Sequence, residues 1–212
     1  MQPHDSEPVL STGRPIGSAR AAMVMIHGRN AGPENILDLA RLLPHPDYAF
    51  LAPAAAGGTW YPLSFLVETA RNEPGLSSGL GVIHGLIGSL ESQGIPRRRI
   101  ILLGFSQGAC LSSEYAVRHA ARFGGVVALS GGLIGPPGTA WNYPGNFEGT
   151  PVFLGCSDVD GHIPRARVDE SAAVFSGMGA AVTERIYPGM GHQVNEDELE
   201  FVRRLMEAVA VE

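Results

Sequence analysis

Near the middle of this 212-residue chain, a serine stands between two glycines in the segment Gly104-Phe105-Ser106-Gln107-Gly108. Four apolar residues run into this segment, and a helical pattern follows it at once. A strand, a tight turn and a helix in this order make a nucleophile elbow, in which the flanking glycines allow the strand and the helix to approach closely. The strained turn lifts the serine hydroxyl clear of the sheet, so we predict that Ser106 is a catalytic nucleophile.

Serine is a weak nucleophile at neutral pH and needs a base within about 2.6–3.2 Å, which a third group orients. Among the seven histidines, His192 is the best placed, because it follows the last expected strand in a Gly-Met-Gly-His loop, whereas His4, for example, lies in a tail. Two carboxylates compete for the third role. Asp160 begins an Asp-x-x-Ile-Pro segment, and Asp158 stands at Gly-x-x-Asp spacing from Gly155. We favour Asp160 and expect the other to cap a helix or bind loop backbone; the chain order Ser…Asp…His suits either.

A serine attack on a carbonyl also needs two N–H donors for the oxyanion. We expect the backbone N–H of Gln107, which follows the nucleophile, to be one of them. The turn His27-Gly28-Arg29 is expected to supply the other through the N–H of Arg29, with the ring of His27 bracing the turn. The side chain of Arg29 either faces solvent, which we favour, or meets an anionic group of the substrate.

Two long segments without periodicity, 54–75 and 131–149, follow expected strands. Long irregular segments in a compact domain are often functional. We expect Trp60, Tyr61 and Phe65 to line an acyl- or alcohol-binding groove there; the alternative is a satellite core. Cys110, one turn into the elbow helix, is expected to be buried packing.

Apolar runs and helical patterns alternate along the whole chain. Strands are expected over 21–26, 48–53, 100–103, 126–130, 151–156 and 183–187, helices over 33–43, 76–93, 107–119, 164–176 and 196–209, and a short edge hairpin between 9 and 16. This alternation predicts one α/β domain over residues 1–212, with a mostly parallel sheet and helices on both faces. Ligands bind at the carboxyl ends of such strands, which is where Ser106, the two aspartates and His192 fall.

Composition narrows the class of protein. A net charge of −6 with no basic stripe argues against nucleic-acid binding. No apolar run approaches about 18 residues, so membrane insertion is not expected. The first residues lack a signal-peptide pattern, which predicts a cytoplasmic location. The two cysteines fit a reducing compartment. No cluster has metal-ligand spacing and no phosphate loop is present, so we expect neither a metal nor a cofactor. The apolar residues of 54–75 would allow a homodimer.

The chain resembles the phospholipase/carboxylesterase family, which includes the acyl-protein thioesterases and is related to dienelactone hydrolases. The resemblance rests on His27-Gly28, Gly104–Ala109, the Asp160-x-x-Ile163-Pro164 segment and Gly191-His192. It implies an α/β-hydrolase fold without a large lid, hydrolysis of short- to medium-chain carboxylic esters without a cofactor, and the roles of Ser106, Asp160 and His192 as nucleophile, acid and base. The chain departs from the family where Arg29-Asn30 replace a common Leu-Gly, and where Cys156 and Ser157 replace a common His-Gly.

We therefore expect a serine esterase. The alternatives are a thioesterase or lysophospholipase that uses the same triad, and a non-catalytic binding protein on a hydrolase scaffold. Natural substrate and acyl-chain length have no signature in the sequence.

Overall fold

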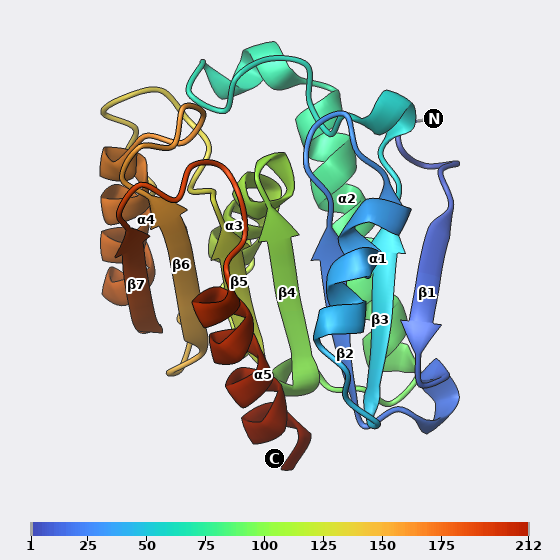
Figure 1. Cartoon of the computed structure of the whole chain (residues 1–212). Helices are drawn as coiled ribbons and strands as arrows, with labels where there is room; N and C mark the ends of the chain where they lie inside the picture. The colour runs from blue at the N-terminus through green and yellow to red at the C-terminus, as the bar shows by residue number, and fades with distance from the viewer. Residues whose placement is uncertain (1, 212) are drawn as a thin grey trace.

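The computed structural model describes residues 2–211. Its centre is a seven-stranded sheet of order β1-β3-β2-β4-β5-β6-β7 (Figure 1). Every neighbouring pair is parallel except β1 with β3. The strands are β1 Val9–Gly13, β2 Ala21–Ile26, β3 Tyr48–Pro53, β4 Ile100–Phe105, β5 Gly125–Leu129, β6 Pro151–Ser157 and β7 Ala181–Tyr187.

Five α-helices cover the two faces of this sheet (Figure 1). They are α1 Pro33–Leu42, α2 Gly75–Ser92, α3 Gln107–Arg118, α4 Arg165–Gly177 and α5 Glu196–Val211. Residues of α1 and α5 pack into one apolar core, and residues of α2, α3 and α4 pack into another on the opposite face. This three-layer arrangement confirms the predicted α/β-hydrolase fold.

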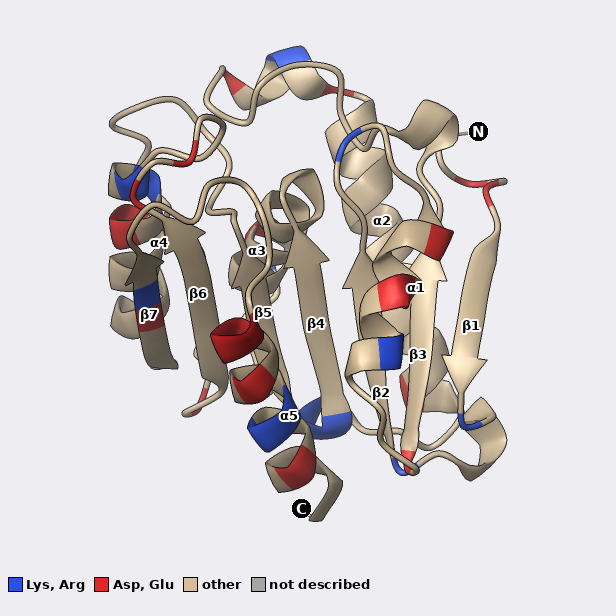
Figure 2. Cartoon of the chain, viewed as in Figure 1, with Lys and Arg blue, Asp and Glu red and all other residues tan. Residues whose placement is uncertain are grey.

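The inner strands are apolar along their length because both of their faces are covered. Every residue of β2 and β3 is buried, and strands β2 to β6 carry no Lys, Arg, Asp or Glu (Figure 2). Parallel strands that are buried on both faces show this continuous apolar pattern. In contrast, the edge strand β7 has no fully buried residue and carries Glu184 and Arg185.

The hairpin expected between residues 9 and 16 is wrong. Val9–Gly13 forms the edge strand β1, which pairs antiparallel with β3 from Val9↔Pro53 to Gly13↔Ala49, and Ile16–Ser18 forms a short 3₁₀ helix. Without β1, one edge of β3 would have unpaired backbone groups, and the first strand pairs with them. A local sequence pattern does not show this distant partner.

The carboxyl ends of the parallel strands meet at one end of the sheet, which is the top in Figure 1. Residues 27–32 follow β2, Ser106 follows β4, residues 158–164 follow β6, and residues 188–195 follow β7. Irregular chain over 54–74, which includes two short 3₁₀ helices, and over 130–150 runs between the elements. In residues 2–211, no helix is both long and apolar enough to cross a membrane.

Candidate active site

The turn at Ser106 connects β4 to α3 and is strained. Ser106 has φ 55° and ψ −120°, a conformation that L-residues rarely adopt. A Cβ atom at Gly104 would overlap the backbone of Gly108, and a Cβ atom at Gly108 would overlap the carbonyl of Ile26. The two glycines are therefore required by the close approach of β4, α3 and β2, and this approach places the Ser106 side chain above the sheet.

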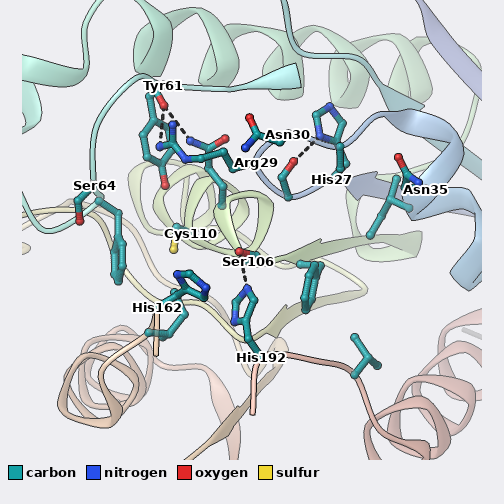
Figure 3. Close-up of a pocket in the computed structure, with 18 of the residues that line it drawn as sticks. His27, Arg29, Asn30, Asn35, Tyr61, Ser64, Ser106, Cys110, His162 and His192 are labelled. Carbon is teal, nitrogen blue, oxygen red and sulfur yellow. Dashed lines mark hydrogen bonds between the residues drawn. The ribbon is translucent and has the colours of Figure 1, made fainter. Parts of the chain in front are cut away.

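Three polar side chains from separate loops meet at this turn. His192 Nε2 lies 2.8 Å from Ser106 Oγ, and His192 Nδ1 lies 2.7 Å from Asp160 Oδ2. Figure 3 shows the imidazole of His192 pointing at the Ser106 hydroxyl. If Nδ1 carries the proton and donates it to the carboxylate, Nε2 is free to accept a hydrogen bond from the hydroxyl. The pattern matches a nucleophile, a base and an orienting acid.

The carboxyl group of Asp160 is completely buried, and protein groups donate hydrogen bonds to both of its oxygens. Burial opposes its ionisation, yet hydrogen bonds from His192 and from the backbone N–H groups of His162 and Ile163 outweigh burial and hold the pKa of Asp160 below its ordinary value. Asp160 is thus an anion at neutral pH, as a group that stabilises an imidazolium must be.

Asp158, the competing carboxylate, has a different environment. Its Oδ1 accepts a hydrogen bond from the backbone N–H of Gly189 at 2.8 Å. The neighbouring Ser157 Oγ accepts one from the N–H of Gly191 at 2.9 Å. Both groups therefore tie the loop after β6 to the loop that carries His192, and Asp158 binds loop backbone as expected for the aspartate outside the triad.

The backbone N–H groups of Arg29 and Gln107 flank the serine. Gln107 is the first residue of α3, where backbone N–H groups have no intrahelical acceptor. The turn that carries Arg29 packs against the elbow, because a Cβ atom at Gly28 would lie 3.3 Å from Ser106 Cβ. Among residues 2–211, neither N–H has a protein acceptor. These two donors are available to a negatively charged oxygen bound beside the Ser106 hydroxyl.

His27 lies under this turn and braces it. It is 1% exposed, its Nε2 accepts a hydrogen bond from Ala55 N–H at 3.1 Å, and its Nδ1 lies 2.8 Å from the carbonyl O of Gly28. Burial lowers the pKa of His27 despite the nearby carbonyl. The neutral ring can accept at Nε2 and donate at Nδ1, so both contacts are satisfied.

Arg29 is exposed, as we favoured, and its side chain also binds the protein itself. Its guanidinium donates hydrogen bonds to the carbonyl oxygens of Tyr61, Pro62 and Leu63 at 3.0, 2.9 and 2.7 Å. The amide of Gln107 continues this anchoring, since it accepts from Trp60 N–H and donates to Tyr61 O. Residues next to the nucleophile and in the oxyanion turn thus fix the backbone of 60–63.

A pocket of about 800 Å³ opens over Ser106. Tyr61 and Phe65 are among the residues that line it, as the sequence suggested, together with Leu63, Ile163 and the buried thiol of Cys110. Figure 3 shows Tyr61 and Cys110 near Ser106. Burial raises the pKa of Cys110 to about 11, so this thiol is not ionised at neutral pH.

Trp60 does not line the pocket, so it is removed from the expected substrate contacts. Its side chain is fully buried in the core. The indole packs on α2 at Gly79 and donates a hydrogen bond from Nε1 to the carbonyl of His27 at 3.0 Å. The aromatic pair Trp60-Tyr61 therefore divides into one supporting residue and one pocket residue, a distinction that loop composition does not carry.

Other pocket residues were not anticipated. His162 lies two residues after Asp160, and its ring packs edge-on against His192 with centroids 4.8 Å apart. The pocket is also lined by Asn30, Asn35, Ile36, Leu39, Phe105 and Val194. The position of His162 between Asp160 and Ile163 could have indicated that it lies in the pocket. The pocket residues of α1 (Asn35, Ile36 and Leu39) had only a helical pattern, which does not indicate a pocket. Within residues 2–211, no group of three His, Cys, Asp or Glu side chains is arranged to hold a metal ion.

Known proteins share this architecture. The family model described as Phospholipase/Carboxylesterase matches residues 11–210. A phospholipase/carboxylesterase structure from Dyadobacter fermentans is 39% identical, covers 98% of this chain and 99% of its own, and superimposes with a TM-score of 0.92.

Curated relatives include two proteins named acyl-protein thioesterase 1. The one from Saccharomyces cerevisiae is 28% identical over an alignment of 214 positions, which covers 90% of this chain and 93% of that protein. The one from Gibberella zeae is 31% identical over an alignment of 140 positions, which covers 64% of this chain and only 60% of that protein's length. With the family model matching nearly the whole chain, the protein belongs to the phospholipase/carboxylesterase family of α/β hydrolases.

Proposed function

We propose that this protein is a serine hydrolase of carboxylic esters with Ser106, His192 and Asp160 as its catalytic triad. The observation that carries the proposal is the continuous hydrogen-bond chain from Ser106 Oγ through the imidazole of His192 to Asp160 Oδ2, with distances of 2.8 and 2.7 Å. Hydroxyl, base and orienting carboxylate stand in the order that nucleophilic catalysis requires.

In the first half-reaction, Ser106 Oγ bonds to the acyl carbon as its proton moves to His192 Nε2. The resulting oxyanion accepts hydrogen bonds from the N–H groups of Arg29 and Gln107, and Asp160 stabilises the imidazolium. The bond from carbon to the alcohol oxygen then breaks, and His192 gives its proton to that oxygen. The alcohol leaves and an acyl-enzyme remains.

In the second half-reaction, His192 removes a proton from water, whose oxygen attacks the acyl carbon. The second tetrahedral intermediate uses the same two N–H donors. Collapse releases the carboxylic acid and returns the proton to Ser106.

Pocket shape and lining support small, largely apolar esters as substrates. The apolar residues that line the pocket include Tyr61, Phe65, Ile163, Ile36, Leu39 and Val194. Arg29, the only Lys, Arg, Asp or Glu among the pocket residues that the structure describes, has its guanidinium engaged with backbone carbonyls. An acyl chain of short to medium length fits this lining.

The direct test is hydrolysis of p-nitrophenyl acetate and butyrate by the wild type and by Ser106→Ala. The wild type should hydrolyse both esters, and the variant should lose nearly all of this activity. Covalent labelling of the wild type, but not of Ser106→Ala, by a fluorophosphonate would separate an enzyme from a binding protein on the same scaffold. Equal turnover by both proteins would refute the proposal.

A second candidate function is thioester hydrolysis with the same triad. It is favoured by those curated relatives that are named acyl-protein thioesterase 1. A matched pair of substrates with the same acyl chain, one an ester and one a thioester, distinguishes the two by the ratio of kcat/KM.

A further inference from the structure

An imidazole from the N-terminal tail is buried behind the oxyanion turn. His4 is 3% exposed, although its chain neighbours on both sides are exposed. Its Nδ1 accepts a hydrogen bond from the backbone N–H of Ala56 at 3.0 Å, and its Nε2 lies 3.0 Å from the carbonyl O of Trp60. Because the amide needs an acceptor at Nδ1, the ring proton is on Nε2 and is donated to Trp60. One side chain thus joins both ends of the segment 56–60.

His27 holds Ala55, the residue before this segment, through the same kind of hydrogen bond. Its Nε2 accepts the N–H of Ala55, next to the N–H of Ala56 that His4 accepts. Between the two imidazoles lies the indole of Trp60, with ring centroids 5.3 Å from His4 and 5.0 Å from His27. The three buried rings and two neighbouring amides form one unit that we call the 55–60 clamp: His4, His27 and residues 55–60.

The clamp is hydrogen-bonded to the oxyanion turn on both sides of Arg29. Before Arg29, the carbonyl of His27 accepts the indole N–H of Trp60 at 3.0 Å. After Arg29, the N–H of Asn30 donates to the carbonyl of Gly58 at 2.8 Å. Asn30 has φ 58°, a left-handed conformation that this bond helps to hold. The direction of the Arg29 N–H, between these two fixed points, therefore depends on the clamp.

We propose that His4 is a positioning residue for the oxyanion hole, which it serves by fixing the 55–60 clamp and, through it, the N–H of Arg29. This inference rests on the proposed function of Ser106. His4 does not touch the substrate pocket, so its effect should fall on the transition state. An oxyanion exists only after attack on the carbonyl, and a misdirected donor reduces kcat with little change in KM.

Two substitutions at His4 separate hydrogen bonding from packing. His4→Phe keeps a ring against Trp60 and removes both ring hydrogen bonds, whereas His4→Gln keeps one acceptor and one donor. Asp5→Asn is the matched control, because Asp5 is exposed and, within residues 2–211, its carboxylate accepts only the N–H of Gln2. Kinetics on p-nitrophenyl butyrate are combined with the inhibition constant of a trifluoromethyl ketone, which forms a tetrahedral adduct on Ser106.

We expect His4→Phe to reduce kcat about 10- to 100-fold with KM changed less than about threefold, a loss below that of deleting a donor outright. The inhibition constant of the ketone should rise by the same factor as kcat falls. His4→Gln should recover most of the loss, and Asp5→Asn should match the wild type. A folded His4→Phe variant with wild-type kcat and ketone affinity would overturn the inference, as would a loss confined to KM.

If His4→Phe does not fold, the partner side of the hydrogen bond gives the same test. Ala56→Pro removes the N–H that His4 accepts, and Ala55 already has the extended backbone (φ −95°, ψ 139°) that precedes proline. It should lower kcat and ketone affinity together, and wild-type values for both would overturn the inference. Activity that survives in Ser106→Ala would refute the proposed function itself, whereas an inactive Ser106→Ala beside a fully active His4→Phe would refute only the role of His4.

Discussion

His192 Nδ1 and Asp160 Oδ2 lie 2.7 Å apart, with the carboxylate fully buried and the imidazole partly exposed. We predict that Asp160→Asn lowers kcat on p-nitrophenyl butyrate about 10³- to 10⁴-fold, because an amide at this position no longer holds the productive tautomer of His192. Steady-state kinetics measure the loss.

Asp158→Asn is the control for this change, since Asp158 accepts a backbone N–H from Gly189 and makes no contact with the His192 ring among the residues described. We expect kcat within about fivefold of the wild type, because only one loop hydrogen bond is weakened. If Asp158→Asn lost activity and Asp160→Asn kept it, Asp158 and not Asp160 would be the acid of the triad.

Arg29→Gln should weaken substrate binding to the same extent for neutral and for anionic esters. The guanidinium fixes the carbonyls of residues 61–63, which form one wall of the pocket, and it is occupied by these contacts. Loss of charge-assisted hydrogen bonds at a partly exposed site should raise KM about tenfold. The measurement is KM for a neutral ester and for a matched ester with a carboxylate on its acyl chain; a much larger rise for the anionic ester would mean that Arg29 binds it directly.

Ionisation of the buried Glu198 carboxyl should destabilise the folded state as pH rises. It is fully buried at the start of α5, its Oε2 accepts the N–H of Asn195, and its Oε1 has no partner among residues 2–211. Burial raises the pKa of Glu198 to about 7. The folded state therefore holds a proton that the unfolded state loses near pH 4.5, so stability falls as pH rises from about 4.5 to about 7.

Glu198→Gln removes this cost. The free energy of unfolding of the variant minus that of the wild type should be about 2 to 3 kcal/mol larger at pH 8 than at pH 4.5. Urea denaturation at the two pH values gives the comparison. Glu200→Gln is a partly exposed control in the same helix. A hydrogen bond from Arg204 lowers the pKa of Glu200, so this variant should show a small change of opposite sign. A pH-independent effect of Glu198→Gln would contradict the prediction.

His162 should influence which alcohol the enzyme prefers. In acylation, His192 gives its proton to the leaving oxygen, so the alcohol lies near His192, against which the ring of His162 packs. We expect His162→Ala to change the ratio of kcat/KM between a methyl and a phenyl ester of the same acid about fivefold, a value typical of one lost side-chain contact. A series varied only in the acyl chain should keep its order. Equal effects on both series would place His162 outside alcohol recognition.

Sequence reasoning succeeded where local pattern and structure coincide. The apolar runs identified the inner strands because these strands are covered on both faces, and Gly104 and Gly108 marked the elbow because their backbones have no room for a Cβ atom. The alternation of strands and helices then placed His192 and Ser106 at one end of the sheet.

Long-range contacts of loops were not accessible in this way. Asp158 and Asp160 differ by two positions in one loop, and only the fold decides which of them lies beside His192. Trp60 and His4 have no periodic pattern around them, so their burial against each other could not be inferred. Strand β1 was misread because its partner, β3, lies almost forty residues further along the chain.

The docking of the N-terminal segment has a practical consequence for anyone who modifies this protein. Its buried residue His4 lies at the end of the sheet that carries the nucleophile, whereas α5 leads to the opposite end of the molecule (Figure 1). Affinity tags, fluorophores or surface-coupling groups attached in front of residue 2 therefore add bulk at the same end of the molecule as Ser106. The same additions behind α5 leave that end of the enzyme unobstructed.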